Sequence, residues 1–301
     1  MIILLFLALT LSNSFSHSLL KNTSEVAAIF HQKCVQTLPT ESVNRKILSS
    51  LLCGENITDT ELKDKLIKTS LIHIFVISGS HLILLDELLS ILRIPVFVRF
   101  LFLSFYSLAV GWQPPAVRAL VALGARILFQ RWSWKFPVDF AVLIAGCITL
   151  ALFPEWWNSL SLVMSWCAAL ALCWVSVLKV RNKFSALLLS QLAIFLFMSA
   201  PLWGLGALHP LSLLYNLLLA PVVAFVLLPL AFFAVLIHPL LTVFDFVMKG
   251  FEAILKFAAE PITITAGTSP SIGLLWGWVF AWHIFFHLLR LRLYQGRDLS
   301  R

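Results

Sequence analysis

The stretch SLIHIFVISGSHLILLDELL, residues 70–89, decides the fold class, because it is long and apolar enough to cross a bilayer. It also contains two acids and two histidines, His73 and His81. Such side chains are costly in hydrocarbon, so we expect them to face the protein interior or a water-filled path. We expect the helix to break at the SGS sequence 78–80, where Gly79 would offer backbone groups to that path.

The composition of the whole chain leads to the same class. Hydrophobic residues make up 60% of the chain and charged residues 12%, which excludes a soluble globular domain. A spanning helix needs about 20 mainly apolar residues. Candidate stretches lie near residues 2–18, 70–90, 94–111, 114–130, 137–153, 159–178, 184–203, 210–237, 240–260 and 271–289. We therefore predict an all-α, polytopic membrane protein with about 9–10 transmembrane helices, some of them broken or re-entrant.

The positions of Lys and Arg predict the orientation, because short loops rich in these residues stay in the cytoplasm. Three such clusters lie at 131–135, 179–183 and 290–301. Most of the net charge of +8 is explained by this rule, so charge alone does not require a polyanionic partner. The predicted parts are a signal peptide or N-terminal anchor helix (1–20), a short extracytoplasmic polar segment (21–69), a helical transmembrane domain (70–290) and a basic cytoplasmic tail (291–301).

The cysteines fall into two groups. Cys34 and Cys53 lie in the predicted outer segment, where a disulfide can form, and they are a candidate pair. The others lie in predicted helices, where cysteine usually fills the core: Cys147, Cys167 and Cys173. The chain contains no Cys-x-x-Cys and no closely spaced Cys/His set. We therefore predict no metal site and no cofactor.

A second unusual stretch is GWQPPAVRALVALGARIL, residues 111–128. Pro114 and Pro115 should start a helix, because proline at a first helical position costs little. Arg118 then lies one turn inside the outer end of that helix. It would either line a path or pair with Asp86 or Glu87. A guanidinium stays charged and offers a fork of donors, which suits it to gripping a phosphate.

A third region, residues 190–232, is interrupted by prolines and glycines, among them Pro201 and Pro221, so we expect broken helices. The amide of Asn216 would either satisfy a carbonyl that Pro221 leaves unpaired or contact a transported molecule. Beyond this region, four charged residues recur at spacings of four, three and four and predict a charged helix face with ion pairs: Asp245, Lys249, Glu252 and Lys256. Such a helix can lie in the membrane interface instead of crossing.

Taken in order, four segments resemble the competence domain of the ComEC family of DNA-uptake membrane proteins. They are LLCGENITDTELKDKLIKTSLIHIFVISGSHLILL (51–85), PPAVRALVAL (114–123), LFPEWWNSLSLVMSWCAALAL (152–172) and SQLAIFLFMSAPLWGLGALHPLSLLYNLLLAPVV (190–223). The similarity covers about residues 45–290. Each segment alone is weak, whereas all four in this order are fairly specific.

The resemblance implies a multi-pass channel, not an enzyme, in the bacterial inner membrane. It would pass one strand of incoming DNA into the cytoplasm during natural transformation. The implied partners are single-stranded DNA, membrane lipids, a cytoplasmic DNA-translocating motor, periplasmic DNA-binding proteins and, for an oligomeric pore, further copies of the chain. Transferred position by position, the path residues are His73, Ser78, Gly79, His81, Arg118 and Asn216. The helix breaks fall at Pro114, Pro115, Pro201 and Pro221.

The chain also departs from the family pattern. Family members usually read Ser-Gly-Leu-His, whereas this chain has Ser80 before His81, and Ser70 stands where glycine is common. Larger members carry an OB-like domain and a metallo-β-lactamase-like domain. Only about fifty polar residues precede the core here, and no His-x-His-x-Asp-His motif follows it. We therefore expect the competence domain alone, without nuclease activity.

Two other functions fit parts of the sequence. An intramembrane hydrolase could use Ser78 or Ser80 as nucleophile, with one of four histidines as base: His81, His209, His283 or His287. Adjacent residues such as Ser80 and His81 point to different faces of a helix, which disfavours that pair. A transporter of another anion or of a lipid-linked substrate would also use broken helices and a buried arginine.

Overall fold

The computed structural model describes residues 22–75, 79–134, 137–178, 180–204, 211–260, 268 and 270–298. Every regular element within these ranges is a helix, and none is a strand, which confirms the predicted all-α class. The expected signal or anchor segment lies outside the described residues, as does the end of the tail.

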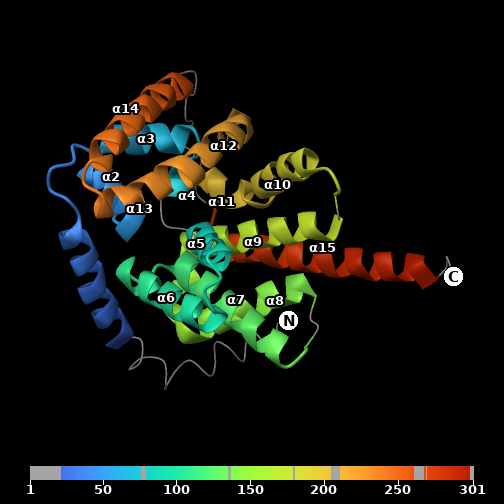
Figure 1. The fold of residues 1–301 in the computed structure, drawn as a ribbon. Coiled ribbons are helices and arrows are strands. Elements are labelled where there is room, and N and C mark those ends of the chain that lie inside the picture. The colour runs from blue at the N-terminus through green and yellow to red at the C-terminus, as the bar shows by residue number, and fades with distance from the viewer. Residues whose placement is uncertain are drawn as a thin grey trace.

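One end of the molecule is built from two distant parts of the chain (Figure 1). We call it the outer part, because residues 21–69 within it are predicted to lie outside the cytoplasm. Its core includes Leu51, Leu66, Phe75, Phe244 and Phe251. Asp59 lies just before the helix Thr60–Lys68 and caps it, because its side chain accepts a hydrogen bond from Leu62 N at 3.0 Å. The helices are residues 22–37, α2 (Arg45–Cys53), α3 (Thr60–Lys68), α13 (Leu228–Leu236) and α14 (Leu240–Ala259).

A second group of helices runs toward the C-terminal end, with α9 and α15 side by side (Figure 1). Trp166 and Trp276 fill its centre, and the Trp166 indole donates a hydrogen bond to His283 Nε2 at 3.0 Å. Arg290 Nη1 lies 2.8 Å from Asp139 Oδ1, which ties the last helix to the start of α8. The helices are α8 (Val138–Leu152), η1 (Pro154–Asn158), α9 (Leu160–Leu178), α10 (Lys183–Phe197), α11 (Ser199–Gly204) and α15 (Ile272–Asp298).

The remaining helices carry the stretch that decided the fold class. Residues 70–89 contribute α4 (Ile72–Phe75) and α5 (Gly79–Ile91), on either side of residues 76–78, which are outside the described ranges. The α5 helix packs with α6 (Val96–Ala109) and α7 (Pro114–Arg131).

The proline-rich region forms a distorted helix. Pro221 lies inside α12 (Leu211–Val222), which continues as a π-helix, Val223–Leu227, and then as α13. A proline removes one backbone donor, and a π-turn is a common accommodation of such a defect. Pro201 lies within the short helix α11.

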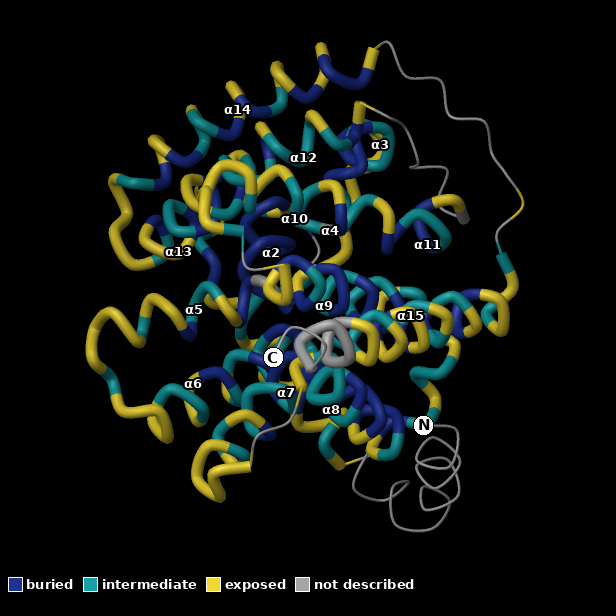
Figure 2. Tube along the Cα trace, turned by 90° about the vertical axis from the view of Figure 1, so that its right-hand side faces the viewer, coloured by how far each residue is buried: buried dark blue, intermediate teal, exposed yellow. Residues whose placement is uncertain are grey.

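The apolar surface is that of a membrane protein. Within the described ranges, three helices are long and apolar enough to cross a membrane: Leu160–Leu178, Leu211–Leu236 and Ile272–Arg292. Shorter apolar helices are Val96–Ala109, Val138–Leu152 and Lys183–Phe197. Exposed positions continue along several of these helices (Figure 2), including Phe105 and Phe225. Such exposure of large apolar side chains suits contact with lipid, and the exact number of crossings stays a prediction.

Candidate functional site

Arg118 is a buried cation. Pro114 and Pro115 occupy the first two positions of α7, so Arg118 follows one turn later, and it is only 7% exposed. Its Nε donates a hydrogen bond to Ser165 Oγ of α9 at 2.9 Å. Among the described residues, no carboxylate lies within ion-pair distance of this guanidinium. A buried charge normally has a counter-charge, so an unpaired one indicates a special role.

The N-terminal end of α5 lies beside this arginine. A side-chain carbon added at Gly79, the first residue of α5, would lie 3.1 Å from Ala119 Cβ and 3.3 Å from the Pro115 carbonyl oxygen. It would lie 3.9 Å from Ser165 Oγ. Glycine therefore permits the close approach of α5 to α7. We call Gly79, Arg118 and Ser165 the Arg118 site.

The electrostatics of the Arg118 site favour an anion. Arg118 places a full positive charge inside the protein, beside the first described residue of α5. A guanidinium in this position attracts negative charge and can bind a phosphate or carboxylate.

The other path candidates in this stretch are placed less fully. His81 is 3% exposed and lies in the first turn of α5. His73 lies in α4, and its side chain is not described. Ser78 lies outside the described residues.

Asp86 pairs with two other arginines. Of the two alternatives for Arg118, the ion pair with Asp86 or Glu87 is therefore not found among the described residues. The Asp86 carboxylate lies 3.5 Å from Arg99 Nε and 3.6 Å from Arg126 Nη2. Arg99 also donates to the Asp86 carbonyl oxygen at 3.1 Å. The turn between α5 and α6 brings Arg99 back onto Asp86, which spacing along a single helix could not predict.

A second polar region lies between α10 and α12. The Asn216 side chain donates to the Ser212 carbonyl oxygen at 2.8 Å, four residues earlier, and not to a carbonyl freed by Pro221. A pocket there is lined by Gln191, Ile194, Phe195, Met198, Leu202, Ser212, Leu213 and Asn216. The buried Ser212 hydroxyl has no hydrogen-bond partner in the described part of the chain. The region therefore offers neutral polar groups without a charge.

Aromatic rings form stacked pairs near several helix ends. Phe153 and Trp156 stack with centroids 4.0 Å apart, and Trp157 and Trp276 stack at 4.8 Å. By contrast, Trp132, Trp134 and Trp203 are more than half exposed, as expected of an interfacial belt.

Two of the histidines proposed as hydrolase bases already have partners. His283 Nε2 accepts from Trp166, and His287 Nδ1 lies 3.0 Å from Arg290 Nη2. His209 lies outside the described residues. The described ranges also hold no group of three or more His, Cys, Asp or Glu side chains that could bind a metal ion.

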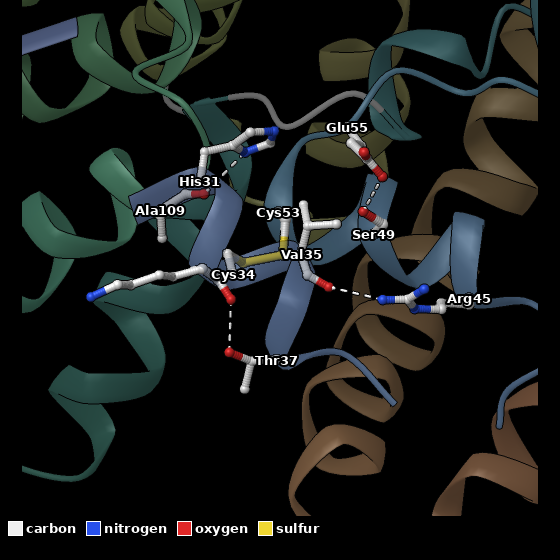
Figure 3. Close-up of a disulfide and its surroundings, with 10 residues drawn as sticks. His31, Cys34, Val35, Thr37, Arg45, Ser49, Cys53, Glu55 and Ala109 are labelled. Carbon is white, nitrogen blue, oxygen red and sulfur yellow. Dashed lines mark hydrogen bonds between the residues drawn. A yellow bond between two sulfur atoms is a disulfide. The ribbon is translucent and has the colours of Figure 1, made fainter. Parts of the chain in front are cut away.

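The outer part contains a disulfide between Cys34 and Cys53, which joins helix 22–37 to the end of α2 (Figure 3). These are the two cysteines that the sequence singles out. Nearby, His31 Nδ1 lies 3.3 Å from the Ala109 carbonyl oxygen at the end of α6. The disulfide holds helix 22–37 within the outer part, and the His31 contact links that helix to α6.

Comparison with known proteins gives the family. The model of the Competence protein family matches residues 51–292, which is most of the chain. The uncharacterized protein MG316 of Mycoplasma genitalium is 27% identical over 210 residues, covering 67% of this chain and 54% of that protein. The chain thus spans about half the length of this relative. No solved structure matches. Together with its apolar helices, the match shows that the chain belongs to the Competence protein family, the membrane proteins of competence and DNA uptake.

Proposed function

We propose that this protein is the inner-membrane channel through which single-stranded DNA enters the cytoplasm during natural transformation. The observation that carries the proposal is Arg118, a buried guanidinium bonded to a hydroxyl and unpaired with any described carboxylate, beside the N-terminal end of α5.

A path for a nucleic acid strand needs several cations or amide donors, each of which binds only weakly. Each nucleotide carries one negative charge, so a strand in hydrocarbon requires a wet path that compensates that charge. A site that bound each phosphate tightly would stop the strand from moving on. We propose that Arg118 is one of these weak sites.

The Ser165 hydrogen bond sets the direction of the guanidinium. It uses Nε, and within the described residues Nη1 and Nη2 have no hydrogen-bond partner. These two nitrogens form the edge that can grip a phosphate with two parallel hydrogen bonds. We propose that Ser165 is a positioning residue and that Arg118 touches the strand.

The remaining path residues have proposed roles of two kinds. Gly79 would allow the α5 amides to reach the strand, with His73, Ser78 and His81 along the same stretch. Asn216, with Ser212 and Gln191, would provide neutral hydrogen-bonding groups farther along. Stacking of bases on aromatic rings would add attraction that does not depend on sequence.

The orientation of the chain in the membrane is part of the same proposal. The outer part would face the extracytoplasmic side, and the basic tail would lie in the cytoplasm. Arg290 and Asp139 support this orientation, because their ion pair joins the tail helix to a residue beside the 131–135 cluster, and both are predicted on the cytoplasmic side. The proposed channel carries no catalytic residue, and a cytoplasmic motor, periplasmic DNA-binding proteins and further copies of the chain remain proposed partners.

The test is uptake of labelled DNA in a strain lacking the gene. We expect the DNase-protected cytoplasmic signal to disappear on deletion and to return with the wild-type gene. Surface-bound DNA should remain, because binding precedes passage. Unchanged uptake in the deletion strain, in a background without another member of the family, would contradict the proposal. It would favour transport of another anion, since the Arg118 site suits any phosphate or carboxylate.

A further inference from the structure

The α14 helix has three different faces. One face is buried in the outer part and includes Leu241, Phe244, Met248, Phe251 and Leu255. This face packs against α3 and α13. Although α14 is 20 residues long, it is not among the helices that are apolar enough to cross a membrane.

A second face of α14 is apolar and exposed. Phe246 and Phe257 are 77% and 79% exposed, and Val243 and Ile254 are 46% and 53% exposed. Their spacing of three, eight and three residues places them on one stripe of the helix. A side chain added at Gly250, within the stripe, would meet nothing within 4 Å. We call these four side chains the exposed stripe of α14. Exposed positions alternate with buried ones along this helix (Figure 2).

The third face of α14 carries charged side chains, and its acidic and basic groups have different surroundings. Asp245 is turned into the outer part, where it accepts from Ser42 Oγ at 2.9 Å and from Asn44 Nδ2 at 3.0 Å. Lys249 and Lys256 are exposed and have no ion pair with any described carboxylate. The ion pairs expected along this helix face therefore do not form. The exposed stripe is left beside two free cations.

We propose that α14 lies parallel to the membrane in its outer interface, with the exposed stripe among acyl chains and both lysines at anionic phospholipid headgroups. An apolar stripe beside lysines is the pattern of interfacial helices. The preceding span, Leu211–Leu236, supports lipid as the occupant, because it ends in the exposed side chains of Phe233 and Leu236. Only residues 237–239 separate this span from α14, and Ile237 among them is also exposed.

This arrangement seats the outer part on the bilayer. The helix 22–37, α2 and α3 are held to α14 and its neighbour α13 by the shared core and by the Asp245 hydrogen bonds. The inference concerns how the outer part meets lipid. Whether the inference is correct does not depend on whether the protein passes DNA.

Depth measurement by electron paramagnetic resonance tests the orientation. Nitroxide labels would be placed by Phe246→Cys and, separately, by Phe257→Cys in vesicles of phosphatidylethanolamine and phosphatidylglycerol. The positions are 11 residues apart, or about 16 Å along a helix axis. A helix in the interface places both labels at the same depth, within roughly 5–10 Å of the headgroup boundary.

Two results would overturn the proposal. Depths that differ by about 16 Å would mean that α14 crosses the bilayer. Two labels in water would mean that the stripe is not covered by lipid. A nitroxide label on Lys249→Cys is the matched control, and this label should be accessible to water. The described free cysteines are buried, so labelling of the unmodified protein gives the background.

A second measurement tests the lysines. Retention of phosphatidylglycerol by the purified protein should weaken about fivefold for each of Lys249→Gln and Lys256→Gln, since a basic residue near an anionic membrane contributes about that factor. Retention equal to wild type would contradict headgroup binding. Both lysines are exposed, so the variants are expected to fold.

Discussion

Arg118 Nε lies 2.9 Å from the Ser165 hydroxyl oxygen, although the two residues are 47 positions apart in the chain. The contact joins α7 to α9 at the place where Gly79 brings α5 closest to α7. A hydroxyl orients the guanidinium without neutralising it. The site therefore keeps a positive charge inside a helical membrane protein.

Replacing Gly146 by alanine should destabilise the α8–α9 packing. A methyl group at this position would overlap the ring of Trp166, which is itself buried and bonded to His283. Overpacking of this kind costs about 1–3 kcal/mol. We expect a lower Tm for Gly146→Ala in detergent.

The matched control is Gly250→Ala. It adds the same methyl group to the middle of a helix where nothing lies within 4 Å, so it should stabilise by roughly 0.5–1 kcal/mol. Equal Tm changes in the two variants would contradict the predicted clash.

The two ion pairs of Asp86 should contribute unequally to the stability of the fold. The Arg99 side chain is 11% exposed and that of Arg126 is 60% exposed. Asp86→Asn would leave Arg99 buried without an anion, which costs about 3–5 kcal/mol, whereas loss of an exposed partner costs about 0–1 kcal/mol. We expect the amount of protein in membranes to fall for Asp86→Asn and Arg99→Gln but not for Arg126→Gln. A larger loss for Arg126→Gln than for Arg99→Gln would refute this ranking.

The Cys34–Cys53 disulfide should form in cells if the outer part faces an oxidising compartment. In intact cells, both cysteines should resist a maleimide reagent until an impermeant reductant is added. The closed loop spans 19 residues, so Cys53→Ser should lower stability by about 3 kcal/mol. Alkylation of both cysteines without a reductant would contradict the disulfide.

Stability should depend on pH through Glu252 of α14. Burial raises the pKa of this carboxyl, and the nearby carboxylates of Asp59 and Glu61 raise it further, while Lys65 opposes them. The fold therefore favours the protonated form. The resulting stability is fully present below the ordinary pKa, about 4.3, and is lost as pH rises through the raised pKa.

We expect Glu252→Gln to be more stable than wild type at neutral pH and equal to it near pH 4. Thermal unfolding across this pH range measures the difference between the two proteins. A difference that stays constant with pH would show that ionisation of Glu252 is not its cause.

Much of the fold follows from the sequence because lipid imposes simple rules. The apolar stretches predict the helices α6 to α10, and two prolines predict the start of α7. The helix 22–37 is missed, because its buried residues are held by the disulfide and the α2 core and not by a regular apolar pattern. The π-helix after Pro221 also depends on packing that a single sequence does not show.

The candidate site is predicted only in part. Gly79 and Arg118 are singled out by a glycine between serines and by an arginine in an apolar helix. Ser165 gives no such signal, because a serine in an apolar helix usually bonds to its own helix, as Ser104 does to Phe100. Its role depends on how α7 packs against α9. The pairing of Asp86 with Arg99 likewise appears only when α5 and α6 are folded together.

The most direct test of the channel is DNA uptake with Arg118→Gln, compared with Arg126→Gln at equal protein levels in the membrane. Glutamine keeps a hydrogen-bonding side chain and removes the charge, and loss of an unpaired buried charge should not destabilise the fold. We predict that DNase-protected uptake falls roughly tenfold to hundredfold for Arg118→Gln, the factor for one charged hydrogen-bonding contact, and stays normal for Arg126→Gln. Normal uptake by Arg118→Gln at normal protein levels would contradict the account.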